Sequence, residues 1–183
     1  MYESRLHPAA TEVPLPPDFR WPGGNRLAVF FRCAFQGWSE RHWADPDIGP
    51  TGHPFESAVP DPSAIGLVEY GERRGIFRVL DTFARAGVKA TMMVSGIMAE
   101  RHPEILRQMS QAGHDIVAHS YAMEAIPLSL DEEDERSNIR RTAELINRAT
   151  GQRPSGWISP RFMASRRTPR LLAEEGFNWR CAQ

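Results

Sequence analysis

His119 is the residue in this sequence whose type and position best suit chemistry. It closes the apolar stretch Asp115–His119 and is followed by polar residues. An imidazole at the end of a strand can bind a metal ion or move a proton, and it can also be a buried histidine with a structural role. Arg161 has a similar position after the stretch Gly156–Ser159. A guanidinium group there can hold a carboxylate or polarise a carbonyl, or it can form a salt bridge at the rim.

Further polar and aromatic side chains follow the other predicted strands. Glu124 could act as a base or a metal ligand, although glutamates in loops are commonly just solvated. Trp38 and Trp157 could wall a substrate pocket, and the alternative is that both belong to the core. Ser95 and Tyr121 are further candidates for the pocket lining. The residues that follow the predicted strands include Phe35, Gln36, Trp38, Glu40, Ser95, His119, Ser120, Tyr121, Glu124, Ser159, Pro160, Arg161, Cys181 and Gln183.

These side chains can share a site only if the strands before them belong to one sheet. The sequence alternates between β-rich and amphipathic helical stretches, and a glycine separates helix from strand at Gly87, Gly113 and Gly176. Such alternation predicts a parallel sheet with helical crossovers, whose carboxyl ends form the ligand-binding edge. We therefore predict an α/β fold, and the alternation itself does not distinguish an open sheet from a closed barrel. The predicted strands are Arg26–Ala34, Val88–Val94, Asp115–His119, Gly156–Ser159 and Phe177–Cys181.

The helical stretches have apolar residues three or four positions apart, as buried helix faces require. Pro103 opens one helix, and Thr168 with Pro169 begins the last. Ser129 and Glu132 match the pattern of a capping box, which predicts the start of a further helix at this point of the chain. Residues 36–68 show no sustained period and are interpreted as a long connection that shapes a binding site. The residues expected on buried helix faces are Ile76, Leu80, Phe83, Leu106, Met109, Ile139, Ala143, Ile146 and Leu172.

Composition narrows the class of protein. The 183 residues carry a formal net charge of −1, which gives no basic excess for binding nucleic acid. The two cysteines do not make a disulfide framework. The proline-rich N-terminus does not resemble a signal peptide, and the longest apolar run is too short to cross a membrane. We therefore expect a cytoplasmic domain without nucleic-acid or membrane partners.

Six segments, in order along the chain, resemble the NodB-type polysaccharide deacetylase superfamily. Together they cover well over half of the sequence with the spacing of that family. The EYG segment at 69–71 and the GW-x-SPR segment at 156–161 resemble the branch of allantoinases and cyclic imidases rather than the sugar deacetylases. The six segments are residues 69–81, 88–106, 112–120, 131–142, 150–161 and 171–179.

The resemblance implies a deformed (β/α) barrel that hydrolyses non-peptide C–N bonds with an activated water. Metal-using relatives hold a divalent ion with an aspartate and two histidines, and metal dependence varies in the allantoinase-like branch. On this basis His119, Glu69 or Glu124 would activate water, and Arg161 would stabilise the oxyanion. His119 and Glu124 are the candidate metal ligands, and the cofactor is either one divalent ion such as Zn²⁺ or none.

Three positions depart from the pattern of the family. The second histidine of its H-[ST]-x-x-H motif falls on Met123, which is a poor ligand for a hard or borderline ion. The acidic pair after the first strand falls near Phe35 and Gln36, where no carboxylate remains. The arginine of the R-x-P segment is displaced beyond the proline, to Arg161. A catalytic Zn²⁺ needs three good protein ligands and an open position, so these departures weaken the expected metal site.

The sequence has 183 residues and five predicted strands. A full (β/α) barrel has eight strands and needs about 200–250 residues. We therefore expect an extended arm over residues 1–24 and a partial (β/α) barrel, incomplete at its C-terminal side, over residues 25–183. The sequence leaves three explanations open. It is part of a longer protein, another chain completes the barrel in a homo- or hetero-oligomer, or it is a degenerate fragment with an interaction role.

Three functions follow from the resemblance. The favoured one is an amidohydrolase that opens a small cyclic amide, imide or ureide, with water activated near His119. The second is a non-catalytic or regulatory subunit of a hetero-oligomeric deacetylase-family complex. The third and weakest is a metal-dependent sugar deacetylase, because the chain lacks the aspartate, the second histidine and a recognisable secretion signal.

Overall fold

The computed structural model describes residues 16–39 and 62–181. The chain divides into two compact units, Met1–Phe30 and Phe31–Gln183, and each is described by itself. In the first unit, the described residues form a short 3₁₀ turn, η1 (Pro22–Gly24), closed by a β-bridge between Trp21 and Asn25. The part of the predicted arm before residue 16 lies outside the described residues, as do Glu40 and Gln183.

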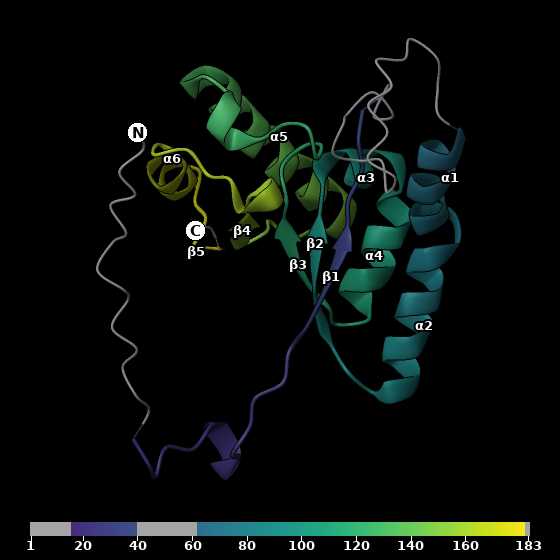
Figure 1. Cartoon of the computed structure of the whole chain (residues 1–183), viewed down its shortest axis with the longest axis vertical. Helices are drawn as coiled ribbons and strands as arrows, with labels where there is room; N and C mark the ends of the chain where they lie inside the picture. Colours follow the sequence, from purple (N-terminus) through teal and green to yellow (C-terminus); the bar gives the residue numbers. More distant parts are fainter. Residues whose placement is uncertain (1–15, 40–61, 182–183) are drawn as a thin grey trace, which may run out of the picture. The chain divides into compact units, whose positions relative to one another are not determined.

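Five parallel strands form the sheet of the second unit, in the order β1-β2-β3-β4-β5 (Figure 1). Each strand pairs with the strand before it in the sequence, which confirms the predicted parallel α/β architecture. Within the described part of the chain, β1 and β5 each have one neighbour, so the sheet is not closed. The strands are β1 (Phe31–Phe35), β2 (Ala90–Val94), β3 (Asp115–Ala118), β4 (Gly156–Ile158) and β5 (Trp179–Cys181).

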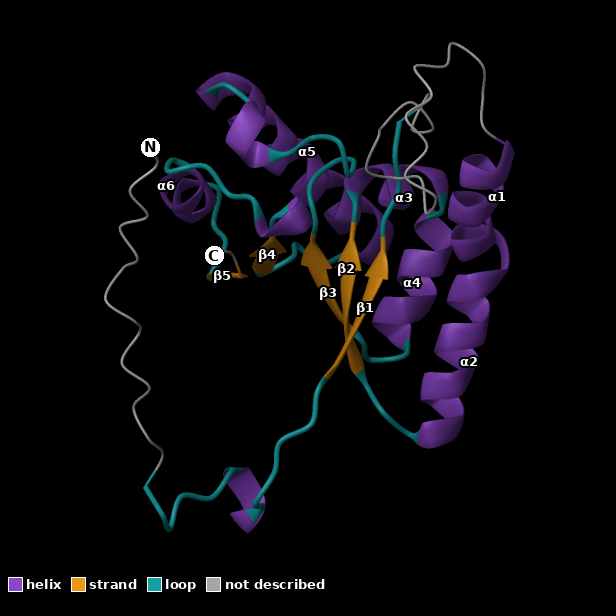
Figure 2. Ribbon diagram, in the orientation of Figure 1, coloured by secondary structure: helices purple, strands orange, loops and turns teal. Residues whose placement is uncertain are grey.

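Helices connect the strands, and α2 and α4 lie along the same side of β1, β2 and β3 (Figure 2). The predicted end of the first regular helix is confirmed, because Gly87 adopts a left-handed conformation with φ of 65°. Pro103 occupies the first turn of its helix, as predicted. The helices are α1 (Pro62–Tyr70), α2 (Ile76–Ala86), α3 (Gly96–Arg101), α4 (Pro103–Gln111), α5 (Glu132–Thr150) and α6 (Thr168–Glu174), with a π-helical turn η3 (Gly71–Gly75) and 3₁₀ turns η4 (Pro127–Ser129) and η5 (Pro160–Phe162).

The core lies between one face of the sheet and the helices, and we call this the covered face. Met92, Val94, Ala118 and Trp157 alternate with open-face residues along β2, β3 and β4, and all four side chains are fully buried. Their helix partners include the predicted apolar positions Leu106, Met109, Ile139 and Ile146. Burying a large apolar side chain stabilises a fold by about 1.5–3 kcal/mol, so this face is the main source of stability.

The opposite face of the sheet, here called the open face, is less covered. Arg32 and Ala34 of β1 are exposed, and their register partners Thr91 and Met93 of β2 are only partly buried. Met93 pairs in turn with Val117 of β3, which places Val117 on the same face. Because side chains two positions apart share a face, the residue two positions beyond Val117 also projects to this side. That residue is His119.

The predicted first strand is wrong in its boundaries. It was expected over Arg26–Ala34 and is found over Phe31–Phe35. Phe31 pairs with Ala90, the first residue of β2, and β2 itself begins only after the turn at Gly87. Residues 26–30 of the predicted strand are not part of a strand.

The capping box predicted from Ser129 and Glu132 is also wrong. Ser129 ends η4, and its hydroxyl donates to the carbonyl of Ile126 at 2.9 Å. The cap of α5 is instead Asp131, whose carboxylate accepts from the amide of Asp134 at 2.9 Å. An aspartate at this position satisfies a free amide and also complements the helix dipole.

Three helical elements lie where no helix was predicted. α1 and η3 occupy the region that includes the end of the long connection 36–68, and α3 follows Ser95 directly. The first residue of α3 is Gly96, where a Cβ would lie only 3.1–3.3 Å from atoms of Tyr121 and Thr142, so the close packing favours glycine. Glycine is a poor helix former, so helix propensity did not predict that α3 begins at this residue.

Candidate active site at the carboxyl ends of the strands

His119 lies directly after β3 and is 4% exposed. Its amide continues the ladder by donating to Val94 at 2.9 Å. Its ring nitrogen Nδ1 lies 2.6 Å from the carbonyl oxygen of Ile158 in β4. A carbonyl can only accept, so Nδ1 carries the proton of the neutral ring. Nε2 is then left with a lone pair that can accept a proton or bind an electrophile.

The surroundings of His119 favour the neutral ring. Burial lowers the pKa of His119, and the nearby charge of Arg32 lowers it further, while the hydrogen bond to Ile158 opposes both effects. A lowered pKa means that the imidazole is largely unprotonated near neutral pH. It is therefore in the form that a general base requires.

The turn after β4 holds two residues in the left-handed region. Arg161 has φ of 54° and Phe162 has φ of 59°, and neither is glycine. Each such residue costs about 1–2 kcal/mol, so the surrounding structure must impose the conformation. The result is that the guanidinium of Arg32 lies 5.4 Å from the centre of the Phe162 ring, a cation–π distance. Arg32 thus links this turn to the electrostatics of His119.

The loop after β3 is fastened to the segment after β1. The amide of Ser39 donates to Oε1 of Glu124 at 2.9 Å, and the amide of Met123 donates to the carbonyl of Gly37 at 3.0 Å. The structure therefore gives Glu124 a positional role across the strand ends. Its predicted roles as base or metal ligand stay predictions.

Asn138 of α5, which the sequence did not single out, fixes the turn after His119. Its Oδ1 accepts from the amide of Tyr121 at 2.8 Å, and its Nδ2 donates to the hydroxyl of Ser120 at 2.7 Å. Ser120 is buried with φ of 61°, and its hydroxyl donates to Ala125 at 2.6 Å. A buried asparagine in an apolar helix face was the signal that could have revealed this role.

Three of the predicted site residues are packed into the structure rather than presented at the rim. Trp157 is fully buried on the covered face, where its ring meets Phe177 edge-on. Ser95 is also fully buried and donates to the carbonyl of His119 at 3.3 Å. Tyr121 packs against the core, with the guanidinium of Arg141 3.7 Å from its ring centre. Trp157 and Ser95 therefore have structural contacts, and their predicted role in lining a pocket stays a prediction.

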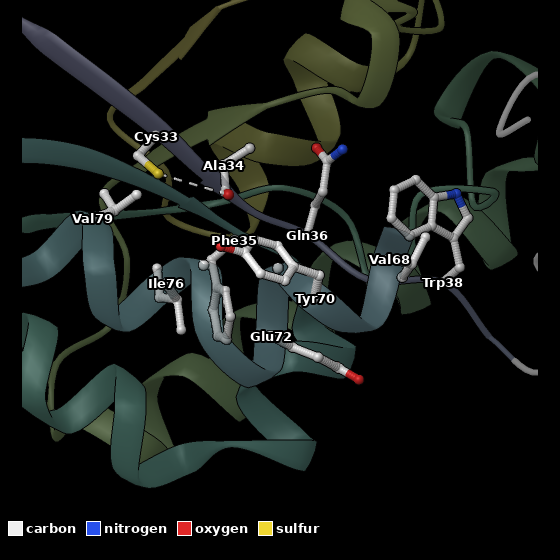
Figure 3. Close-up of a pocket in the computed structure, with 12 residues that line it drawn as sticks. Cys33, Ala34, Phe35, Gln36, Trp38, Val68, Tyr70, Glu72, Ile76 and Val79 are labelled. Carbon is white, nitrogen blue, oxygen red and sulfur yellow. Dashed lines mark hydrogen bonds between the residues drawn. The ribbon is translucent and has the colours of Figure 1, made fainter. Parts of the chain in front are cut away.

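Trp38 lines a cavity, and its predicted role in binding substrate stays a prediction. This cavity of about 420 Å³ lies between β1 and the segment formed by α1, η3 and α2 (Figure 3). Ala34 and Gln36 line it, and these two share the open face with Arg32. Glu72 also lines it and lies 3.3 Å from the imidazole of His102. Glu69 is not among the lining residues and forms an ion pair with Arg73 at 3.1 Å, so its predicted role as a base stays a prediction.

The described residues do not fit the divalent-metal site that the resemblance implied. Within 16–39 and 62–181, no three His, Cys, Asp or Glu side chains come close enough to hold an ion. Nε2 of His119 is one suitable donor. Met123, at the position of the family's second histidine, is 7% exposed and offers only a soft thioether. We therefore derive no catalytic step through a metal.

The described residues form a parallel α/β sheet with a buried histidine and an arginine after the carboxyl ends of its strands. The family model for polysaccharide deacetylase matches residues 58–179. The chain belongs to the polysaccharide deacetylase family, which confirms the resemblance seen in the sequence.

Individual relatives agree with this assignment. A peptidoglycan deacetylase of Helicobacter pylori is 31% identical over 120 residues, which are 66% of this chain and 40% of that protein. A peptidoglycan-N-acetylglucosamine deacetylase of Bacillus cereus is 32% identical over 46% of this chain and 30% of that protein. The crystal structure of Puue allantoinase superposes with a TM-score of 0.76 at 28% identity, covering 94% of this chain and 58% of that one.

The chain thus spans less than two thirds of the length of these relatives. The likeness to Puue allantoinase over nearly the whole chain also supports the predicted partial barrel. Of the helices that the structure describes, none is both long and apolar enough to cross a membrane.

Proposed function

We propose that this domain hydrolyses a C–N bond in a small cyclic amide, imide or ureide. The observation that carries this proposal is the state of His119, a buried neutral imidazole whose Nδ1 is occupied by Ile158 and whose Nε2 keeps its lone pair. The fold similarity to Puue allantoinase supports the choice of a cyclic substrate. The deacetylase relatives support amide hydrolysis in general.

The chemistry needs one water and no redox step. Nε2 of His119 takes a proton from water while the water oxygen forms a bond to the ring carbonyl carbon. The carbonyl oxygen becomes an oxyanion, and Arg161 supplies positive charge at this edge of the sheet. The C–N bond then breaks, and the proton held by His119 passes to the departing ring nitrogen. The product is the ring-opened acid.

The direct test is turnover of a panel of cyclic compounds by the purified protein. Hydantoin, allantoin, succinimide and dihydrouracil would serve as substrates, and oligomers of N-acetylglucosamine as the comparison. We expect ring opening of at least one cyclic compound, with and without EDTA. Activity on the sugar oligomers alone would favour the sugar deacetylase instead. Activity on none of them, with Zn²⁺, Mn²⁺ or Co²⁺ added, would exclude both.

A second candidate function is a non-catalytic subunit of a deacetylase-family complex. It is favoured by Met123 and Gln36, which stand where the resemblance places a histidine and an acidic residue. This candidate predicts that His119→Ala leaves the activity of the complex nearly unchanged. A loss of about a hundredfold or more, the size expected for a general base, would decide for the hydrolase.

We also propose that further strands complete the barrel in the active protein, supplied by a longer form of this chain or by a partner subunit. The proposal is supported by the two edge strands and by the share of the relatives that the chain spans. Intact mass of the natural protein separates the two sources. A mass of 20.7 kDa with a monomeric mass in light scattering would contradict the proposal.

A further inference from the structure

Glu135 is a fully buried carboxyl group that the proposed chemistry does not use. It lies in the first turn of α5 and is 0% exposed. Charged side chains are almost never fully buried without partners. Its side-chain partners all lie within residues 165–168, the stretch that joins the turn at Arg161 and Phe162 to the first residue of α6.

Each oxygen of Glu135 has a hydroxyl donor. Ser165 donates to Oε2 at 2.7 Å, and the hydroxyl of Thr168 donates to Oε1. The guanidinium Nε of Arg167 lies 3.5 Å from Oε2, and the same guanidinium donates to the carbonyl of Leu130 at 2.7 Å. One carboxyl group thus fastens three residues of this segment to the start of α5.

Ser165 and Thr168 also form a reciprocal cap at the beginning of α6. The hydroxyl of Ser165 accepts from the amides of Arg167 at 3.0 Å and Thr168 at 3.1 Å. The hydroxyl of Thr168 accepts from the amide of Ser165 at 2.8 Å. Because both hydroxyl protons go to Glu135, their oxygens are oriented to accept these amides. Glu135 therefore organises the cap as well as anchoring it.

The turn of Arg161 and Phe162 is therefore held at both of its ends. Before it, Ser159 accepts from the indole of Trp157 at 3.1 Å, and its carbonyl accepts from the amide of Phe162 at 2.9 Å. After it, Ser165 is fastened to α5 through Glu135. Two consecutive left-handed residues persist only where both flanks are fixed. The Glu135 network is the fixed point on the C-terminal flank.

We propose that Glu135 is a positioning residue, which holds the strained turn so that Arg161 and Phe162 stay at the carboxyl edge of the sheet. The assignment of Arg161 to the oxyanion rests on the proposed function. The anchoring of the turn does not, so the two parts are measured separately.

The first measurement is amide hydrogen exchange over residues 161–164 in the intact chain. In Glu135→Leu, which keeps the volume and removes both acceptors, we expect exchange in this turn to rise about tenfold or more, because the buried hydroxyls lose their partners. Exchange in β2 and β3 should stay unchanged. The matched control is Glu132→Gln, which removes a surface ion pair between α5 and Arg170 of α6 at 2.8 Å and should leave the turn protected.

An unchanged turn in Glu135→Leu, or an equal loss of protection in every strand, would overturn the proposal. Should the leucine variant fail to fold, Ser165→Ala removes one anchor at lower cost and should give the same local pattern. Glu135→Gln keeps an acceptor oxygen and should restore part of the protection.

The second measurement is a double-mutant cycle with Arg161→Ala, using a cyclic substrate that the protein turns over. Glu135→Gln should lower kcat about tenfold with little change in KM, since Arg161 acts on the transition state. The double variant should be no slower than Arg161→Ala alone, because both changes remove one effect. Additive losses would show that Glu135 does not act through Arg161. Absence of turnover in the unmodified protein would overturn the proposed function, and hydrogen exchange would still decide the role of Glu135.

Discussion

β3 is flanked by two buried histidines, and their rings are used in opposite ways. His114 precedes the strand, and its Nδ1 accepts from the amide of Ala90 at 3.1 Å. His119 follows the strand, and its Nδ1 lies against the carbonyl of Ile158 at 2.6 Å. Burial lowers the pKa of both rings, assisted by Lys89 at His114 and by Arg32 at His119.

The two ends of the strand therefore prepare different tautomers. Nδ1 of His114 is already engaged as an acceptor by the fold, whereas Nδ1 of His119 is engaged as a donor and Nε2 keeps its lone pair. Both rings are buried and both have a lowered pKa, so neither property identifies the functional histidine. The hydrogen-bond partner of Nδ1 distinguishes the two rings. At the carboxyl end of β3, the partner is the carbonyl of Ile158 in β4. At the other end, the partner is the amide of Ala90 at the start of β2.

The largest expected difference is in turnover. His119→Ala should lower kcat/KM for a cyclic substrate by about 10²–10⁴-fold, as the loss of a general base does. His114→Ala should change it by no more than about threefold, because it removes no group that the proposed reaction uses. Steady-state kinetics of both variants at neutral pH provide the measurement. Equal losses in the two folded variants would abolish the distinction between the ends.

Stability should show the reverse order. His114→Ala leaves the buried amide of Ala90 without an acceptor and should lower the free energy of unfolding by about 1–3 kcal/mol. His119→Ala removes one donor from the carbonyl of Ile158, and carbonyls tolerate such a loss better than amides do. Urea denaturation at pH 7.5 compares the two variants. A greater loss in His119→Ala would contradict the structural role assigned to His114.

Acid should weaken the fold through both rings. Each histidine has a folded pKa below its ordinary value of 6.5, so the unfolded chain binds more protons in the interval between the two values. The free energy of unfolding should therefore fall as pH drops below about 6.5, and these groups should contribute no pH dependence above about pH 7.5. In the same way, kcat/KM should fall as acid protonates His119.

The control for this pH dependence is His114→Gln, which keeps a polar side chain and removes one titrating ring. Its unfolding free energy should depend less on pH between 5 and 6.5, while the pH dependence of kcat/KM should stay as in the unmodified chain. A shifted kinetic profile in His114→Gln would count against His119 as the base.

The smallest effect is expected at Glu124. Glu124→Gln retains an oxygen that can accept from Ser39, so turnover should change by no more than about threefold if the residue only fastens the loop. Glu124→Ala should reduce turnover more than the glutamine variant does. A loss with Glu124→Gln as large as that with His119→Ala would instead support the predicted role of Glu124 as a base.

The sequence predicted the parts of the fold that depend on local signals. Four of the five strands were located closely. Glycine suits the left-handed residue that ends a helix, so each such glycine marked where the next apolar stretch could begin as a strand. His119 was placed at a strand end for the same reason. The sequence left open whether Trp157 lines a pocket or belongs to the core, because strands buried on both sides show no polar alternation that reveals which face a side chain takes.

Long-range partners could not be predicted. The tautomer of His119 depends on Ile158, and the turn at Arg161 depends on Glu135, and both partners are distant in sequence. Glu135 lies in a run of acidic residues that looks like a solvated helix start complementing the dipole. Its burial follows from the packing of α5 against α6, which local sequence does not encode.

The order of the strands has a consequence for how the protein is made. Since every strand pairs with the one synthesised just before it, each new strand leaving the ribosome meets an edge that is already in place. Pairing need not wait for distant segments, and the sheet can grow in one direction during translation. The carboxyl edge with His119 is then assembled stepwise, and the ring receives its partner only once β4 has emerged.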